Sequence, residues 1–203
     1  MSRGAAGGPA GAADPSDREL VRLFQDGRED AFITLMQRHE RRVYNLAYRL
    51  LGGREDAREA TQEAFLSCFR HLRSFRGEAA FSTWLHRIAV NACYDTIRRR
   101  PEGISLDAAE GLEPPPAPDH SDATAQSVDV QRALLTVPEE FRAVLVMHDL
   151  QDLPLQEIAE SLEIPVGTVK SRLHRGRVSL GRALKGDSRE PESLPAPSKP
   201  PSP

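Results

Sequence analysis

The sequence has few of the features that mark a secreted or membrane protein. No run of apolar residues approaches the roughly 18 that a membrane-spanning helix needs, and the N-terminal stretch MSRGAAGGPAGAADP lacks the apolar core of a signal peptide. The two cysteines, Cys68 and Cys93, are too far apart for a C-x-x-C site and too few for a disulfide framework. We therefore expect a soluble, cytoplasmic protein without membrane insertion, in which both cysteines are buried as small apolar residues.

The sequence also lacks the motifs that indicate a catalytic or metal site. Its six histidines are scattered, and it contains no H-E-x-x-H pattern, no glycine-rich phosphate loop and no cysteine placed with a general base. We predict no catalytic residue, no metal site and no cofactor. An enzyme is a remote alternative function, and a panel of hydrolase assays would reveal catalytic activity.

Lysine is scarce as well, with three lysines against 24 arginines, and the formal net charge is −3 at pH 7. Because arginine is abundant throughout the chain, its number alone indicates little, but its distribution is informative. Residues 166–185 contain six basic residues and no acid, namely Lys170, Arg172, Arg175, Arg177, Arg182 and Lys185. A solvated surface helix usually mixes both signs of charge, so this segment favours an anionic partner.

Three stretches of low complexity divide the chain. Gly, Ala and Pro dominate residues 1–14, Pro and Ser dominate residues 186–203, and residues 101–126 combine prolines with six acids and no Lys or Arg. Such segments bury too little apolar area to offset the entropy lost on ordering. We expect disordered tails at both ends and a flexible acidic, proline-rich linker between two small helical domains, residues 15–100 and 127–185.

The first domain is predicted to be all helix. Ser16 and Glu19 have the spacing of a capping box, and apolar residues at three- and four-residue spacing then continue to a stop at Gly52. A second periodic stretch covers residues 55–72, and a third begins near Phe81, where Ser82 is expected to cap the helix. Alanines form the apolar face of residues 55–72. The opposite face is acidic and comprises Glu55, Asp56, Glu59, Gln62 and Glu63.

The third predicted helix carries a polar and aromatic stripe. Its members recur at three- and four-residue spacing and are Trp84, Arg87, Asn91, Asp95 and Arg98, with Arg99 beside them. An indole can stack on an unpaired base, an amide can pair with a base edge and arginines can hold phosphates, so the stripe suits single-stranded nucleic acid. Two plainer interpretations stay open: Trp84 as a core anchor, and Asp95 as an ion-pair partner of a neighbouring arginine.

The second domain contains the pattern of a helix-turn-helix. Helices are expected near residues 128–135 and from Pro138 onward, and residues 155–162 and 166–175 then form two apolar faces separated by a tight turn. With Val166, Val169 and Leu173 in the core, the exposed side of the last helix carries groups suited to base edges and phosphates. These are Thr168, Lys170, Ser171, Arg172, His174 and Arg175. A merely solvated basic helix is the alternative.

In order and spacing, these segments resemble the extracytoplasmic-function sigma factors, the small promoter-recognition subunits of bacterial RNA polymerase. The shared motifs are DA-x-E-x-x-QE-x-F in residues 56–65, FSTWL-x-RIA-x-N in residues 81–91 and GTVKSRL-x-R in residues 167–175. The resemblance covers the chain except for its tails and linker. It implies an all-α fold with a sigma region 2 helical bundle and a sigma region 4 helix-turn-helix.

The resemblance also implies partners and roles. Core RNA polymerase, through its beta-prime and beta subunits, and promoter DNA are the expected partners; an anti-sigma factor is a further candidate, and the sequence names none. The family docks on the beta-prime coiled coil through the segment that here holds Asp56, Glu59, Gln62 and Glu63. The loop at residues 75–80, with Arg76, and the stripe on the third helix would serve the minus-ten element, and the last helix the minus-thirty-five element.

Three residues depart from the family pattern. Glu163 stands in a turn where glycine is common, His86 replaces an aromatic residue, and Gly176 replaces a usual alanine at a cost of about 1 kcal/mol of helix propensity. The linker is either a strand for a nucleic-acid channel of the polymerase or a plain spacer. A helix-turn-helix regulator acting without polymerase is the nearest alternative function, but it leaves the acidic face and the stripe around Trp84 without a role.

Overall fold

The computed structural model describes residues 14–100 and 125–186, and all regular elements in these ranges are helices. The predictions for the two tails and for most of the linker lie outside the described residues. In the described part, no helix combines the length and apolar character needed to cross a membrane. The prediction of an all-α chain is confirmed, and α5 begins at Ala125, just inside the predicted linker.

The first domain consists of four helices, α1 (Asp17–Gln25), α2 (Asp30–Leu51), α3 (Arg54–Leu72) and α4 (Phe81–Arg99). The predicted capping box is present, since the Ser16 backbone N–H donates to the Glu19 carboxylate at 2.7 Å and the Ser16 hydroxyl accepts from the Glu19 N–H. The predicted cap at Ser82 is wrong. Helix α4 begins at Phe81 with Ala80 as its N-cap, so Ser82 lies within the first turn.

The core of this domain forms where α2, α3 and α4 pack on one another. Alanines on α3 let the helices approach closely, and leucines of α2 and α4 fill the space between them. Both cysteines are fully buried, as predicted. Helix α2 ends at Leu51, and its C-cap Gly52 has a left-handed φ of +81°. Leu135 of the second domain packs so closely there that a Cβ on Gly52 would lie 2.5 Å from the Leu135 Cδ1.

The second domain runs from α5 (Ala125–Thr136) through α6 (Glu139–Leu145) and α7 (Leu155–Leu162) to α8 (Val166–Leu184). Helix α6 continues directly into a π-helical segment, η2 (Val146–Leu150), whose Val146 and Met147 are fully buried. The packing around α8 explains why position 176 is glycine and not the alanine that is usual in the family. A Cβ there would lie 3.1 Å from the Phe141 carbonyl oxygen, so the glycine allows α8 to approach α6.

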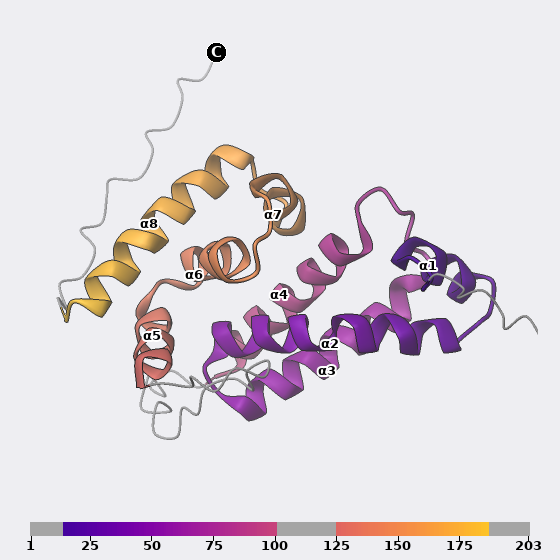
Figure 1. Cartoon of the computed structure of the whole chain (residues 1–203), viewed down its shortest axis with the longest axis horizontal. Helices are drawn as coiled ribbons and strands as arrows, with labels where there is room; N and C mark the ends of the chain where they lie inside the picture. The colour runs from indigo at the N-terminus through magenta and orange to yellow at the C-terminus, as the bar shows by residue number, and fades with distance from the viewer. Residues whose placement is uncertain (1–13, 101–124, 187–203) are drawn as a thin grey trace, which may run out of the picture.

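The two domains are packed against each other, which the sequence did not predict. Helix α5 contacts both α2 and α8, and α7 contacts α4 (Figure 1). The helix-turn-helix therefore lies beside the helix that carries the polar and aromatic stripe.

Candidate nucleic-acid and polymerase interfaces

The helix-turn-helix is held by a small apolar contact between α7 and α8. Ile158 and Val169 are fully buried, and Ala159 and Leu173 nearly so. The turn between the helices has Glu163 in the left-handed region, with φ at +52°. A glutamate there is strained relative to glycine, which adopts this conformation without steric cost. This packing leaves the opposite side of α8 toward solvent.

The six residues predicted to contact the minus-thirty-five element lie on the solvent side of α8, with unequal exposure. Lys170, Ser171, His174 and Arg175 are exposed, whereas Thr168 and Arg172 are half-buried. The half-buried arginine forms an ion pair of 2.8 Å with Glu140 of α6.

Two arginines of α8, Arg175 and Arg177, each contact a neighbouring helix. The Arg175 guanidinium lies 5.8 Å from the centre of the Phe141 ring, a cation–π distance. Arg177 forms a bidentate pair with Asp149, with N–O distances of 2.9 and 2.6 Å, and this pair lowers the pKa of the Asp149 carboxyl. Arg177 is thereby tied to η2, while Arg175 has no carboxylate partner among the described residues. Of the two, Arg175 is the better placed to meet an anionic partner.

The stripe predicted for the minus-ten element has an exposed half and a packed half. Asn91, Asp95 and Arg98 are exposed, and Asp95 pairs with Arg98 on the same helix, as one of the plainer interpretations expected. Trp84 is half-buried: its ring centre lies 4.7 Å from that of Phe75 and 6.1 Å from that of Phe81. An aromatic cluster thus anchors the indole, which remains partly exposed.

Two arginines of the minus-ten set are engaged elsewhere. Arg87 forms an ion pair of 2.8 Å with Glu163 in the turn of the helix-turn-helix. Arg99, at the end of α4, reaches α3, where it pairs with Glu63 at 3.0 Å and lies 3.9 Å from Glu59. The hydrogen bond to Glu63 raises the pKa of the Arg99 guanidinium. Arg76, in contrast, is almost fully exposed in the loop before α4.

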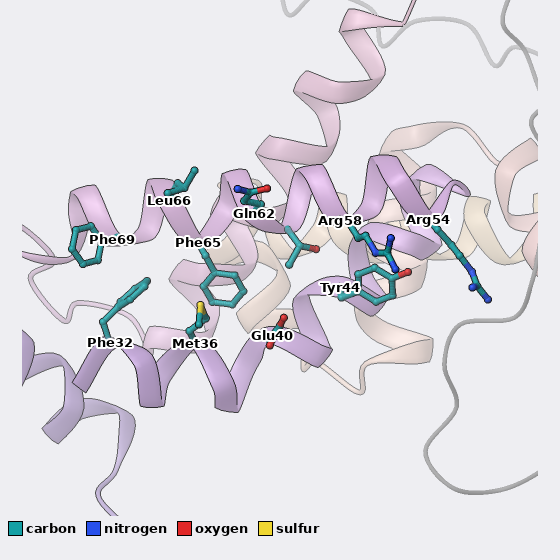
Figure 2. A pocket seen from close by; sticks show the side chains of 11 residues that line it. Phe32, Met36, Glu40, Tyr44, Arg54, Arg58, Gln62, Phe65, Leu66 and Phe69 are labelled. Carbon is teal, nitrogen blue, oxygen red and sulfur yellow. The ribbon is translucent and has the colours of Figure 1, made fainter. Parts of the chain in front are cut away.

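The predicted polymerase-binding face on α3 is therefore not an isolated acidic patch. Glu59 and Glu63 face Arg99, and Asp56 pairs with Arg100, so three of its carboxylates are partly neutralised by the end of α4. Gln62 also lines the edge of a groove between α2 and α3 (Figure 2).

This groove was not predicted. It has a volume of about 970 Å³, and its walls are mainly apolar, with α2 supplying Phe32 and Met36 and α3 supplying Phe65, Leu66 and Phe69 (Figure 2). Leu66 is 47% exposed and Phe69 40% exposed, unusually high for large apolar side chains. The sequence signal was present, because both residues interrupt the polar side of α3.

Two family models match the chain: Sigma-70 region 2 over residues 35–101 and Sigma-70, region 4 over residues 127–180. The ECF RNA polymerase sigma factor SigM of Mycobacterium tuberculosis is 40% identical over 177 residues, which cover 87% of this chain and 89% of SigM. SigW of Bacillus subtilis, also an ECF RNA polymerase sigma factor, is 34% identical and covers 83% of this chain and 96% of its own length. The chain belongs to the ECF RNA polymerase sigma factors.

Solved structures agree with this assignment. The structure of CnrH in complex with the cytosolic domain of CnrY matches 85% of this chain and 99% of the CnrH chain. The TM-score is 0.66 and the sequence identity is 25%. RpoE of Bartonella quintana, in complex with the anti-sigma factor NepR, matches 77% of the sigma factor with a TM-score of 0.61; at 21% identity it supports the fold alone.

Metal and thiol chemistry find no support in the parts of the sigma factor that the structure describes. No group of three or more His, Cys, Asp or Glu side chains lies in a metal-binding arrangement within residues 14–100 and 125–186. Burial raises the pKa of both Cys68 and Cys93 to about 12, which keeps these thiols protonated and unreactive at neutral pH.

Proposed function

We propose that this protein binds core RNA polymerase as a sigma factor and directs initiation at promoters by reading their minus-thirty-five and minus-ten elements. The observation that carries the proposal is the solvent side of α8: the second helix of a helix-turn-helix exposes basic residues and contains no acid, in a chain of net negative charge. A helix of this kind fits the major groove of duplex DNA.

For the minus-thirty-five element, we assign the contacts to Thr168, Lys170, Ser171, Arg172, His174 and Arg175. The exposed members supply cations for phosphates and side chains for base edges. Arg172 would first have to leave Glu140, and we expect it to hold a phosphate at the edge of the site rather than read a base.

For the minus-ten element, we assign the contacts to the stripe on α4 and the loop before it: Arg76, Trp84, Arg87, Asn91, Asp95, Arg98 and Arg99. Asn91 is the strongest candidate for pairing with an unstacked base, because its amide is exposed and offers both a donor and an acceptor. Trp84 offers a partly exposed, anchored indole for stacking.

For polymerase, we assign the docking surface to Asp56, Glu59, Gln62 and Glu63, and we extend it to the apolar groove between α2 and α3. Gln62 belongs to both surfaces, so the acidic face and the groove are contiguous. An apolar groove with a charged rim is typical of protein–protein contacts. Neither feature suits DNA, because carboxylates repel phosphates.

A transcription regulator that acts without polymerase is the alternative. It would use the second domain alone and leave the groove and the acidic face unused. Nanomolar binding of an isolated promoter duplex by the free protein, unchanged by core polymerase, would favour this alternative.

An anti-sigma partner is a further proposal. CnrH and RpoE of Bartonella quintana are each described in complex with a second protein, CnrY and the anti-sigma factor NepR. We propose that this sigma factor, acting in the cytoplasm beside the polymerase, also has such a partner. No catalysis is assigned to the chain, because the polymerase performs the chemistry of transcription.

The decisive experiment is run-off transcription with purified core polymerase on fragments of the source genome. Specific transcripts that require the protein would support the proposed function. Their absence with a core enzyme that is active with another sigma factor would overturn it.

A further inference from the structure

Helix α3 changes the sign of its charge along its length. The acids of this helix lie in its N-terminal half, and none follows Glu63. Residues 70–76, with the sequence RHLRSFR, run from the last turn of α3 into the loop before α4 and contain three arginines, one histidine and no acid. We call this segment the basic end of α3. Its titratable side chains are all exposed, namely Arg70, His71, Arg73 and Arg76.

Capping of the helix does not account for these arginines. Cations near a helix C-terminus stabilise it when they donate to its last carbonyl groups. Here the carbonyls have other donors: the Gln25 amide of α1 donates to those of Leu72 and Phe75 at 3.1 and 2.8 Å, and the Ser74 hydroxyl donates to that of His71 at 2.9 Å. The end of α3 is therefore satisfied without a guanidinium group.

Pairing with carboxylates leaves the basic end largely uncompensated. Arg70 has no carboxylate partner among the described residues. Arg73 lies 3.7 Å from Glu29 and Arg76 lies 3.9 Å from Glu78, and all four of these side chains are 63% or more exposed, so both pairs are weak and exchange readily. The Arg73 guanidinium also lies 5.8 Å from the centre of the Phe24 ring, a cation–π distance that limits its orientations.

The histidine of the segment is turned toward the helix. The His71 Nδ1 donates to the Ser67 carbonyl at 2.7 Å, so the neutral ring carries its proton on Nδ1 and presents Nε2 as an acceptor. An acceptor does not bind a phosphate oxygen. We therefore assign no contact to His71, and the arginines remain as the groups that suit an anionic partner.

The basic end adjoins the surface proposed for the minus-ten element. Phe75 belongs to the segment, and its ring centre lies 4.7 Å from that of Trp84. Trp84 stands at the N-terminal end of the stripe on α4, and Arg98 stands near the other end. A strand that stacks on Trp84 and leaves the stripe there meets Arg76 first and the last turn of α3 next.

The minus-ten element has different neighbours on its two sides. Upstream, the DNA toward the minus-thirty-five element is duplex, whereas downstream the strands must separate as far as the start site. Trp84 suits an unpaired base and the arginine-rich end of α4 around Arg98 suits duplex phosphates, so the Trp84 end of the stripe faces downstream. Because the template strand has to enter the active site of the polymerase, the strand that remains beyond Trp84 is the single non-template strand.

We propose that Arg70 and Arg73 bind phosphates of the non-template strand just downstream of the minus-ten element, in series with Arg76. Because this contact extends the proposed minus-ten surface, it rests on the proposed function, and it adds two residues and a further stretch of promoter to that surface. Contacts to phosphates carry no sequence information. The basic end therefore stabilises the opened DNA and does not contribute to the choice of promoter.

The test uses holoenzyme and two forked promoter probes with the same duplex and the same minus-ten element. In the short probe, the non-template strand ends at the downstream edge of the element. In the long probe, the strand continues for a few more nucleotides without a complement. The ratio of the two affinities isolates the downstream contact, and a salt series reports the number of phosphates that are held.

Arg70→Gln combined with Arg73→Gln is the principal variant. It should bind the short probe like the wild type, which also shows that the domain is folded, and bind the long probe about tenfold more weakly than the wild type does. Its salt dependence on the long probe should fall by about 1.4 units of slope, since each phosphate on a single strand contributes about 0.7. Arg70→Lys combined with Arg73→Lys keeps both charges and should retain most of the affinity.

Arg41→Gln combined with Arg132→Gln is the matched control. It also removes two exposed arginines, one from α2 and one from α5, at positions outside every surface assigned above. The control should bind both probes like the wild type, with an unchanged salt dependence.

Three results would overturn the proposed contact. The first is a long-to-short ratio that is the same in the glutamine variant and the wild type, including the case in which the extension adds nothing to either. The second is an equal loss on both probes, which would place the arginines on the minus-ten element itself. The third is weaker assembly with core polymerase at an unchanged ratio, which would make the basic end a protein contact. Failure of the proposed function would look different, because wild-type protein and core polymerase would then bind neither probe in a manner that depends on the minus-ten sequence.

Discussion

Arg99 of α4 and Glu63 of α3 form an ion pair with 3.0 Å between guanidinium nitrogen and carboxylate oxygen. The first residue was predicted to contact promoter DNA and the second to contact polymerase. Both are about half exposed, so the pair contributes little to stability and can exchange for other partners. The pair places the proposed DNA surface and the proposed polymerase surface next to each other. Replacing either residue removes the charge that partly neutralises its partner.

Reversing the acidic charges on α3 tests the polymerase surface. Glu59→Lys combined with Glu63→Lys should weaken co-purification with core polymerase at least tenfold, because the face becomes basic and repels Arg99 at the same time. Circular dichroism should show an intact helical fold. The control pair is Asp26→Lys with Glu29→Lys, which reverses two charges in the loop between α1 and α2. Equal binding by both double variants would remove this face from the interface.

A substitution at Leu66 tests whether polymerase covers the groove between α2 and α3. Leu66→Gln adds a polar group to a side chain that is already 47% exposed, so the free energy of unfolding should change by less than about 0.5 kcal/mol. Affinity for core polymerase should fall by about 1 to 2 kcal/mol if an apolar partner covers this residue. Leu184→Gln is the matched control, since Leu184 is 50% exposed at the far end of α8. Equal affinities of the two variants would show that the groove is not covered.

The helices and their motif were predictable because each depends on local spacing. The capping box at Ser16, the stop at Gly52 and the apolar faces of α7 and α8 all follow from residues within a few positions of one another. The cap at Ser82 was misjudged because Phe81 enters the helix one residue earlier, a difference of the size that helix ends commonly show.

The packing between the domains could not be predicted in the same way. Gln131 and Arg142 bond to backbone carbonyls, which every residue carries, so no complementary residue type marks their partners in the sequence. Arg142 even occupies the last turn of the short helix α6, where an arginine suggests a surface position. The pairing of Arg87 with Glu163 depends on this packing and was hidden for the same reason.

His86 should make stability depend on pH. It is 5% exposed and lies near His39, Arg42 and Gln151; burial lowers its pKa from 6.5 to about 4. The unfolded chain therefore binds a proton at higher pH than the folded chain does. Stability is complete above about pH 6.5 and is lost as the pH falls toward 4, by at most about 3 kcal/mol.

Urea unfolding between pH 4 and pH 7.5 measures this effect. The wild type and a control with the exposed His71 replaced, His71→Gln, should lose stability in parallel on acidification. The His86→Gln variant should lose less, because it has no buried imidazole to protonate. Identical pH profiles for all three proteins would show that His86 does not cause the effect.

Two glycines of α8 should respond oppositely to substitution. Gly181→Ala meets nothing within 4 Å and should stabilise the protein by about 0.5 to 1 kcal/mol through helix propensity. Gly176→Val places a branched side chain where a Cβ would already lie 3.1 Å from the Phe141 carbonyl, and should destabilise it by about 2 kcal/mol or more. Thermal unfolding of both variants provides the comparison. A stabilising Gly176→Val would mean that α8 does not approach α6 as described.

Arg175 and Lys170 should have different roles on the minus-thirty-five element. The Arg175 guanidinium lies over the Phe141 ring, which limits its orientations and favours directional contact with a base edge. Lys170 is an exposed point charge suited to a phosphate. Arg175→Ala should cost about 1 to 3 kcal/mol on the preferred element and much less on scrambled DNA. Lys170→Ala should weaken binding to all sequences alike and reduce the salt dependence by about one unit of slope.

The measurement uses holoenzyme on matched and base-substituted minus-thirty-five elements across a salt series. Arg182→Ala serves as a control for the loss of one positive charge near the end of α8. Equal losses on every template would make Arg175 a phosphate contact rather than a base reader. No loss in either Arg175→Ala or Lys170→Ala would mean that the basic side of α8 is only solvated, and the assignment of the minus-thirty-five element to this helix would fail with it.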